Sequence, residues 1–87
     1  MNEQILKDIE KEREYQRKRW GDDFDDQHNT PFHWATYIAN YSTRWPWLID
    51  DPSEFASVLV EFRKRMIQVA ALAIAAVESV DRRVRPN

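Results

Sequence analysis

Apolar residues recur at three- and four-residue spacing along the last third of the chain. The series consists of Phe55, Val58, Leu59, Phe62, Met66, Val69, Ala73, Val77 and Val80. This period predicts one helix of roughly 30 residues, which would be about 45 Å long. Asp51 is the expected cap of this helix, Pro52 its first residue and Glu54 the partner in a capping box.

The segment from Val69 to Val77 is apolar on every side, and a helix of this kind must be surrounded by other helices. Short neighbours from the same chain are too few to do so. The pattern therefore predicts a second copy of the chain in the bundle, as a homodimer or a higher even oligomer.

Two shorter helices are expected before the long one. Asn2 can cap a largely polar helix that ends at Trp20, because Gly21 is a typical residue after a helix end. Thr30 followed by Pro31 predicts the start of an aromatic helix that runs to Trp45 and stops at Pro46. The polar helix has only a thin apolar stripe and should pack by one edge.

Composition agrees with one small all-α domain over residues 1–87, with three main helices in an oligomeric bundle. The chain has 87 residues, 43% of them hydrophobic, with one glycine and no alternating β pattern. A net charge of -2 argues against non-specific nucleic-acid binding. No signal peptide or membrane-spanning run is visible, and the absence of cysteine fits the cytoplasm.

The segment from Gly21 to Asn29 is acidic and aperiodic, which predicts a loop. Its aspartates and His28 are possible metal ligands, but the spacing matches no calcium loop, so solvated turn and cap residues are the favoured interpretation. His33 is expected to make a polar contact at a helix entrance. No serine lies in a nucleophile motif. We therefore expect no catalytic residue, metal or cofactor.

Eight aromatic residues fall within one third of the chain: Trp20, Phe24, Phe32, Trp34, Tyr37, Tyr41, Trp45 and Trp47. Most are expected in the core, and one or two could stack on a flat base. Arg65 lies next to the apolar stripe and needs a carboxylate or a phosphate as its partner. Glu61, four residues earlier, is one candidate for that partner.

The stretches EREYQRKRWGDD, TPFHW and FRKRMIQVAALAIAAVES resemble small phage and prophage members of the MazG-like, all-α nucleotide pyrophosphohydrolase group. The resemblance runs from about Ile9 to Arg83. It implies helical units that dimerise or tetramerise. It also implies a substrate nucleotide held by magnesium on clusters of glutamate and aspartate.

Those acidic clusters are replaced in this chain. The positions that match them carry Asn40, Tyr41, Arg44, Arg65 and Gln68. Side chains of these types cannot neutralise magnesium, so hydrolysis by the family mechanism is not expected.

Arginine can instead bind phosphate directly. With Trp34, the five replacing residues form a candidate pocket in which Arg44 and Arg65 take the phosphates, Asn40 and Gln68 read the base or ribose, and Tyr41 stacks. The resemblance thus suggests a non-catalytic protein that binds a nucleotide-type ligand. In a phage it would sequester a nucleotide signal of host defence, as an anti-defence factor in the host cytoplasm.

Three alternatives remain open from the sequence. The same residues could form a salt bridge and hydrogen-bond set in a purely structural bundle. The chain could be a helical protein-interaction module without a small-molecule ligand, with Trp45 and Trp47 as exposed anchors. It could also be a metal-dependent pyrophosphohydrolase that uses the acidic segment, or Glu54 and Glu61, in place of the family's ligands.

Overall fold

The computed structural model describes residues 2–44 and 55–84, and 90% of these residues are helical. They form four helices and no strand. The helices are α1 (Glu3–Arg19), α2 (Asp22–His28), α3 (Pro31–Ser42) and α4 (Phe55–Val84). None of them is long and apolar enough to cross a membrane, as far as the described residues show.

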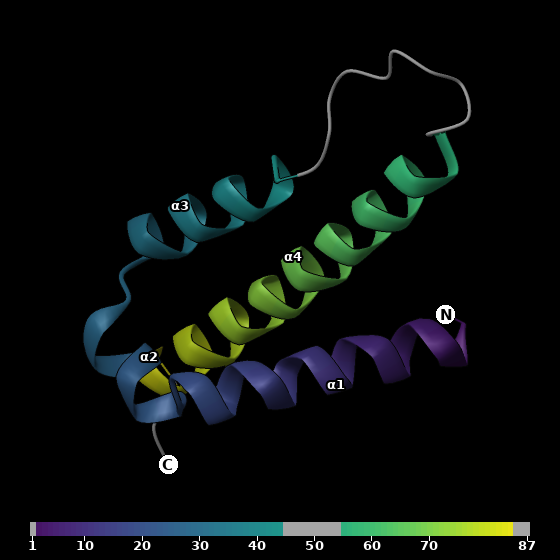
Figure 1. Ribbon diagram of the computed structural model, residues 1–87. Coiled ribbons are helices and arrows are strands. Elements are labelled where there is room, and N and C mark those ends of the chain that lie inside the picture. Colours follow the sequence, from purple (N-terminus) through teal and green to yellow (C-terminus); the bar gives the residue numbers. More distant parts are fainter. Residues whose placement is uncertain (1, 45–54, 85–87) are drawn as a thin grey trace.

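Helix α4 is the central element, and each of the other three helices packs against it. Figure 1 shows α1 and α3 on either side of α4, with α2 crossing near the C-terminal end of α4. Helix α3 runs antiparallel to α4. The all-α class predicted from the sequence is therefore confirmed for the described residues.

The helix ends carry the capping groups expected from the sequence. Asn2 Oδ1 accepts a hydrogen bond from the Gln4 amide at 2.7 Å. At the start of α3, Thr30 Oγ1 accepts from the His33 amide, and His33 Nδ1 accepts from the Thr30 amide, which completes a capping box. Gly21 follows α1 with a φ of 85°, a conformation that L side chains rarely adopt.

The segment expected to be a loop contains α2, so the described chain has four helices where three were predicted. Three aspartates occupy the first turn of α2, where their negative charge interacts favourably with the helix dipole. Asp26 is also held by Ser79 and Arg82 of α4, at 2.7 Å each. A helix this short depends on such tertiary contacts, which its own sequence does not reveal.

Two other helix boundaries were predicted, the end of α3 and the start of α4. Helix α3 ends at Ser42, earlier than the predicted end at Trp45, with Thr43 as its C-cap. The Thr43 amide donates to the Asn40 carbonyl, which tightens the last turn. The cap expected at Asp51, Pro52 and Glu54 lies outside the described residues, as do Trp45 and Trp47.

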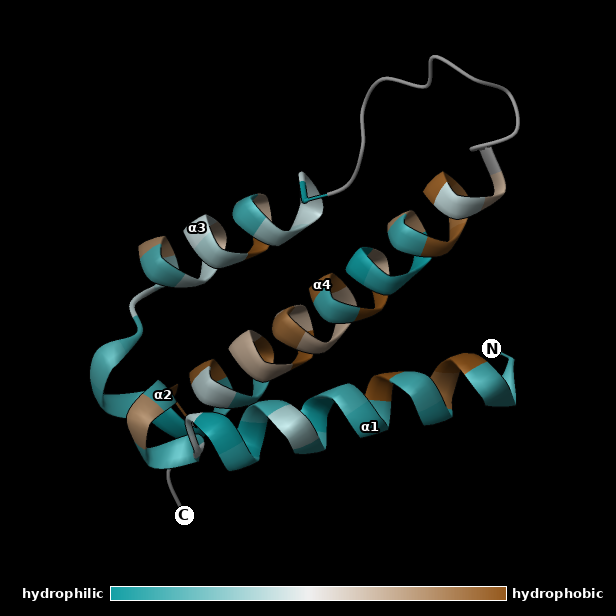
Figure 2. Cartoon of the chain, in the orientation of Figure 1, coloured by the Kyte–Doolittle hydropathy of each residue, from teal (hydrophilic) through white to brown (hydrophobic). Residues whose placement is uncertain are grey.

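The core is small and divided between two seams along α4. On the α3 side, Trp34 packs with Leu72 and Ala75, and Ile38, Tyr41 and Ala76 adjoin them. On the α1 side, which Figure 2 shows to be mostly hydrophilic, the buried residues of α1 are Ile9, Arg13 and Gln16. The prediction that this helix packs by one edge is confirmed.

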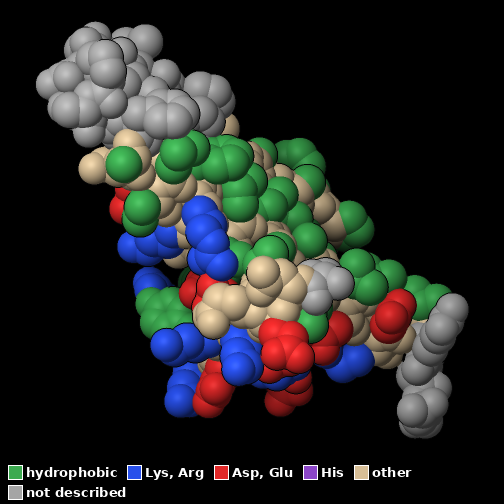
Figure 3. Space-filling model, turned by 90° about the vertical axis from the view of Figure 1, so that its right-hand side faces the viewer, with side chains coloured by type: hydrophobic (Ala, Val, Ile, Leu, Met, Phe, Trp, Pro, Cys, Tyr) green, Lys and Arg blue, Asp and Glu red, His purple; other side chains and the backbone are tan. Residues whose placement is uncertain are grey.

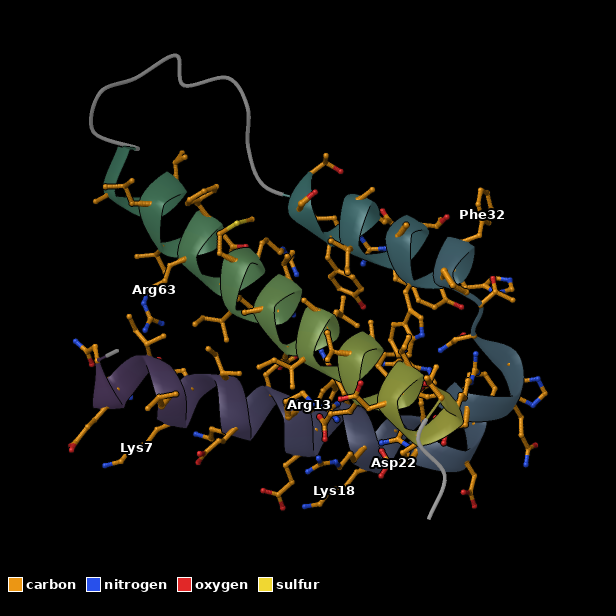
Figure 4. All side chains as sticks on the ribbon, turned by 180° about the vertical axis from the view of Figure 1, so that it is seen from behind. Lys7, Arg13, Lys18, Asp22, Phe32 and Arg63 are labelled. Carbon is orange, nitrogen blue, oxygen red and sulfur yellow. The ribbon has the colours of Figure 1, made fainter. Side chains whose placement is uncertain are left out.

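The expectation that most aromatic residues lie in the core is wrong for the described residues. Only Trp34 is buried, whereas Trp20, Phe24, Phe32 and Tyr37 are exposed. Phe32 is 78% exposed, and Figure 4 shows it pointing away from the helices. Tyr41 is half-buried and packs beside Trp34 in the seam between α3 and α4. Three of the four exposed aromatics border a cavity instead.

Candidate functional site: an aromatic cavity

A cavity of about 280 Å³ opens where α2 and α3 meet α4, beside the end of α1. We call it the aromatic cavity. Its lining consists of Trp20, Phe24, Asp25, Asn29, Trp34, Tyr37, Asn40, Tyr41, Arg44 and Leu72. Its volume is near the lower limit of small-molecule sites, roughly 300 Å³. It has room for one small ring system.

Trp34, Leu72 and Asn29 are the buried residues of the cavity lining, and Trp34 has the largest side chain of the three. It meets Tyr37 edge to face, with 6.3 Å between ring centroids. Its indole Nε1 is buried and has no hydrogen-bond partner. A buried donor without a partner is costly, so this group lowers the stability that Trp34 contributes to the α3 seam.

A polar chain crosses one wall of the cavity. The buried Asn29 donates from Nδ2 to Asp25 Oδ1 at 3.2 Å and accepts from the Tyr37 hydroxyl at 3.4 Å. Burial raises the pKa of the Asp25 carboxyl above its ordinary value, and the charge of Arg13 partly opposes this increase. The wall thus offers hydrogen-bonding groups beside aromatic ones.

Arg44 lies two residues after the end of α3, with its guanidinium over the Tyr41 ring, 4.5 Å from the centroid. Its Nε donates to Asn40 Oδ1 at 3.3 Å. This residue forms no ion pair with any described residue. A cation that is positioned by stacking and lacks a carboxylate partner is suited to an anionic group of a ligand.

Four of the six residues predicted for the pocket line this cavity: Trp34, Asn40, Tyr41 and Arg44. Arg65 and Gln68 do not line it. Arg65 Nε donates to the Arg44 carbonyl at 2.7 Å, and its Nη1 donates to Gln68 Oε1 at 3.0 Å. Gln68 lines a different, more open hollow between α1 and α4.

The expected carboxylate partner of Arg65 is present. Glu61 Oε2 lies 3.7 Å from Arg65 Nη2, one turn earlier on α4. Arg65 therefore has an acidic partner and also ties the end of α3 to α4. It supports the backbone of Arg44 and does not reach the aromatic cavity.

Sequence reasoning left six lining residues out of the predicted pocket: Trp20, Phe24, Asp25, Asn29, Tyr37 and Leu72. The aromatic clustering was the usable signal for three of them. The polar pair Asp25 and Asn29 belongs to the segment that was expected to be a loop, so nothing in its pattern placed it beside α3.

The acidic segment is held mainly by arginines. Asp26 accepts from Arg82 at 2.7 and 2.8 Å and also contacts Arg83 through its backbone carbonyl. Among the described residues, no group of three or more His, Asp or Glu side chains is placed to hold a metal ion. His28 lies against the Phe24 ring, with 4.6 Å between centroids.

The Asp26 contacts predict a specific loss of stability in acid. The hydrogen bond from Arg82 lowers the pKa of Asp26 below its ordinary value of 3.8. A lowered pKa in the folded state stabilises the protein above the unfolded-state pKa, and this contribution is lost as the pH falls through the folded-state pKa. Asp26→Asn should therefore reduce the slope of melting temperature against pH below about pH 4, and should cost about 1–2 kcal/mol at neutral pH.

Melting curves at a series of pH values would measure this effect. Asp23→Asn is the matched control, because Asp23 lies exposed on the same helix and has no ion pair with a described residue. Equal slopes for the Asp26 variant and the unaltered protein would contradict the role of this carboxylate.

Comparison of the chain with family models, with characterised proteins and with solved structures finds no match.

Proposed function

We propose that the chain binds a nucleotide-type small molecule in the aromatic cavity and does not turn it over. The observation that carries the proposal is the position of Arg44, a cation stacked on Tyr41 at the edge of an aromatic cavity and without an acidic partner among the described residues. A flat ring with an anionic tail matches this combination of groups.

Each part of the cavity has a role in this proposal. The base lies among the aromatic rings, where stacking contributes about 1–3 kcal/mol per base. The amide of Asn40 faces the edge of the base or ribose. Arg44 receives the phosphate, and Arg65 with Gln68 positions the Arg44 backbone.

The proposal keeps the interpretation drawn from the MazG-like resemblance. The protein is a degenerate, non-catalytic relative of that group, acts without a metal or cofactor, and assembles as an even-numbered helical bundle. In a phage it sequesters a nucleotide signal of host defence in the host cytoplasm. The anion contact is assigned to Arg44, because the charge of Arg65 is already balanced by Glu61.

Thermal shift tests the proposal directly, since a ligand that binds only the folded state must raise the melting temperature. The probes are nucleoside mono-, di- and triphosphates, cyclic nucleotides and cyclic dinucleotides, each with EDTA and with magnesium. At least one probe should raise the melting temperature in EDTA. Arg44→Ala should then weaken its affinity about tenfold or more, as expected for the loss of a charge-assisted contact.

Lys7→Ala is the matched control, because Lys7 is an exposed cation on α1 that points away from the other helices in Figure 4. It should leave the affinity unchanged. A shift that requires magnesium and is accompanied by release of pyrophosphate would overturn the proposal in favour of the hydrolase. No shift with any probe would overturn it in favour of an interaction module.

A further inference from the structure

Asp25 and Asn29 form a hydrogen-bonded polar pair in the wall of the aromatic cavity. Asp25 lies in the middle of α2, and Asn29 is the C-cap of this helix, one turn later. Asn29 is 4% exposed, whereas Asp25 is half-buried. Asn29 Nδ2 donates to Asp25 Oδ1 at 3.2 Å, so the carboxylate and the amide lie side by side. We call these two side chains the carboxylate–amide pair.

The carboxylate of this pair has no cation bound to it. In Figure 3 most Asp and Glu side chains gather in the lower part of the molecule, with Lys and Arg side chains among them. Asp22 and Asp26 of α2 follow this pattern, because both pair with Arg82, at 3.9 and 2.7 Å. Asp25 lines the aromatic cavity and forms no ion pair with a described residue.

The Asp25 carboxylate is therefore short of hydrogen-bond donors. Burial raises the pKa of Asp25 because the charged form loses hydration, and the charge of Arg13 only partly opposes this increase. Within the described part of the chain, the side chain accepts from Asn29 through Oδ1, and Oδ2 has no recorded donor. An ionised carboxylate accepts hydrogen bonds and donates none. A ligand group that suits this position must present N–H donors.

Tyr37 fixes the orientation of the Asn29 amide. The Tyr37 hydroxyl donates to Asn29 Oδ1 at 3.4 Å, so the amide oxygen is occupied and Nδ2 is directed toward Asp25. One hydrogen of Nδ2 binds Asp25, and the second has no recorded partner among the described residues. The carboxylate–amide pair thus presents a single donor beside a carboxylate acceptor.

We propose that the nucleotide bound in the aromatic cavity carries guanine, and that the carboxylate–amide pair binds its Watson–Crick edge. This inference rests on the proposed function. Guanine presents the acceptor O6 beside two adjacent donors, N1–H and the N2 amino group. Asp25 accepts from both donors in a charge-assisted, bidentate contact, and Asn29 donates to O6.

The other common bases do not match the carboxylate. Adenine and cytosine each present one amino donor next to a ring nitrogen that accepts, and uracil and thymine present one N–H between two carbonyl acceptors. In each case an acceptor of the base would face an oxygen of Asp25. A site built around hydrogen bonds rejects such a ligand strongly, because desolvated polar groups are left without partners.

The carboxylate–amide pair and the cation of the cavity lie at opposite ends of α3. Asn29 comes before this helix, and Arg44 follows its C-terminal end. A nucleotide likewise carries its base edge and its phosphate at opposite ends, and the aromatic residues of the cavity lie between the two contacts. A ligand that is cationic throughout would suit Asp25 and would be repelled by Arg44.

Titration calorimetry in EDTA tests the base assignment with four nucleoside monophosphates, those of guanine, hypoxanthine, xanthine and adenine. Inosine monophosphate lacks only the N2 amino group of guanosine monophosphate. The unaltered protein should bind guanosine monophosphate about tenfold or more tightly than inosine monophosphate, as expected for one charge-assisted hydrogen bond. Adenosine and xanthosine monophosphates should bind more weakly still, because each sets an acceptor against the carboxylate.

Asp25→Asn is the sharpest variant, because it predicts a gain of binding. The substitution replaces one acceptor oxygen by an N–H donor, which matches xanthine, where a carbonyl takes the place of the N2 amino group. Affinity for guanosine monophosphate should fall about 10- to 100-fold, and affinity for xanthosine monophosphate should rise about tenfold. A misfolded variant would lose both. Asp23→Asn, on the exposed side of α2 and outside the cavity lining, should leave the order of affinities unchanged.

The outcomes separate this inference from the proposed function. Adenosine monophosphate that binds as tightly as guanosine monophosphate, or Asp25→Asn without a gain for xanthosine monophosphate, would overturn the assignment of guanine and leave nucleotide binding intact. The absence of binding by all four monophosphates would also overturn it. The proposed function itself fails only if the wider set of phosphorylated probes gives no thermal shift.

Discussion

Trp34→Ala is expected to lower the free energy of unfolding by about 3–5 kcal/mol, the range for removing a buried tryptophan or phenylalanine ring. Trp34 is 5% exposed and packs on Leu72 and Ala75, so its loss opens the α3 seam. A domain of this size has a total stability of roughly 4–13 kcal/mol. The variant should be largely unfolded at temperatures at which the unaltered protein is folded.

Urea denaturation followed by circular dichroism would measure this loss. Phe32→Ala is the control, because it removes a ring of similar size from the same helix at a position that is 78% exposed. It should change the free energy of unfolding by less than about 0.5 kcal/mol. Similar losses for both variants would show that α3 is not anchored through Trp34.

The second large effect concerns the ion pair in the α1 seam. Arg13 is 5% exposed and donates to Glu78 at 2.9 Å, while its Nε and Nη1 have no partner. Figure 4 shows Arg13 between α1 and α4. Glu78→Ala leaves this buried charge without its carboxylate, which should cost about 2–4 kcal/mol, somewhat less than for a fully buried pair because Glu78 is 37% exposed.

Arg13→Met is the informative comparison. It removes the buried charge, keeps most of the side-chain volume and leaves Glu78 in contact with Arg17 at 3.3 Å. Replacing a buried ionic group by a well-packed apolar one is often neutral or stabilising. Arg13→Met should therefore destabilise the protein far less than Glu78→Ala in urea denaturation. The reverse order would show that the ion pair itself stabilises the seam.

The parts of the fold that follow from local rules could be predicted from the sequence. Thr30 and Pro31 start a helix because of their own side chains, and the apolar period from Phe55 onward specifies α4 without reference to other elements. Helix α2 could not be found in this way. Its anchors, Ser79 and Arg82, are more than fifty residues away in the sequence.

The residues predicted for the candidate site were grouped by the resemblance to the MazG-like group. Asn40, Tyr41 and Arg44 do line one cavity, because they follow one another at and just after the C-terminal end of α3. The same resemblance predicted Arg65 in the pocket, but its side chain turns toward Glu61 and the Arg44 carbonyl. Helix periodicity gives the face on which a residue lies, and it does not give the partner that a long side chain selects.

Helices α1 and α3 both pack on α4, and neither rests on the other. The two seams also differ in kind, since one is built on a tryptophan and the other on a buried arginine. The aromatic cavity touches both seams, because Trp34 of the α3 seam and Trp20 at the end of α1 line it. Opening of the α1 side would therefore leave the walls contributed by α3 and α4 but displace Trp20, so that damage to either seam should lower ligand affinity as well as stability.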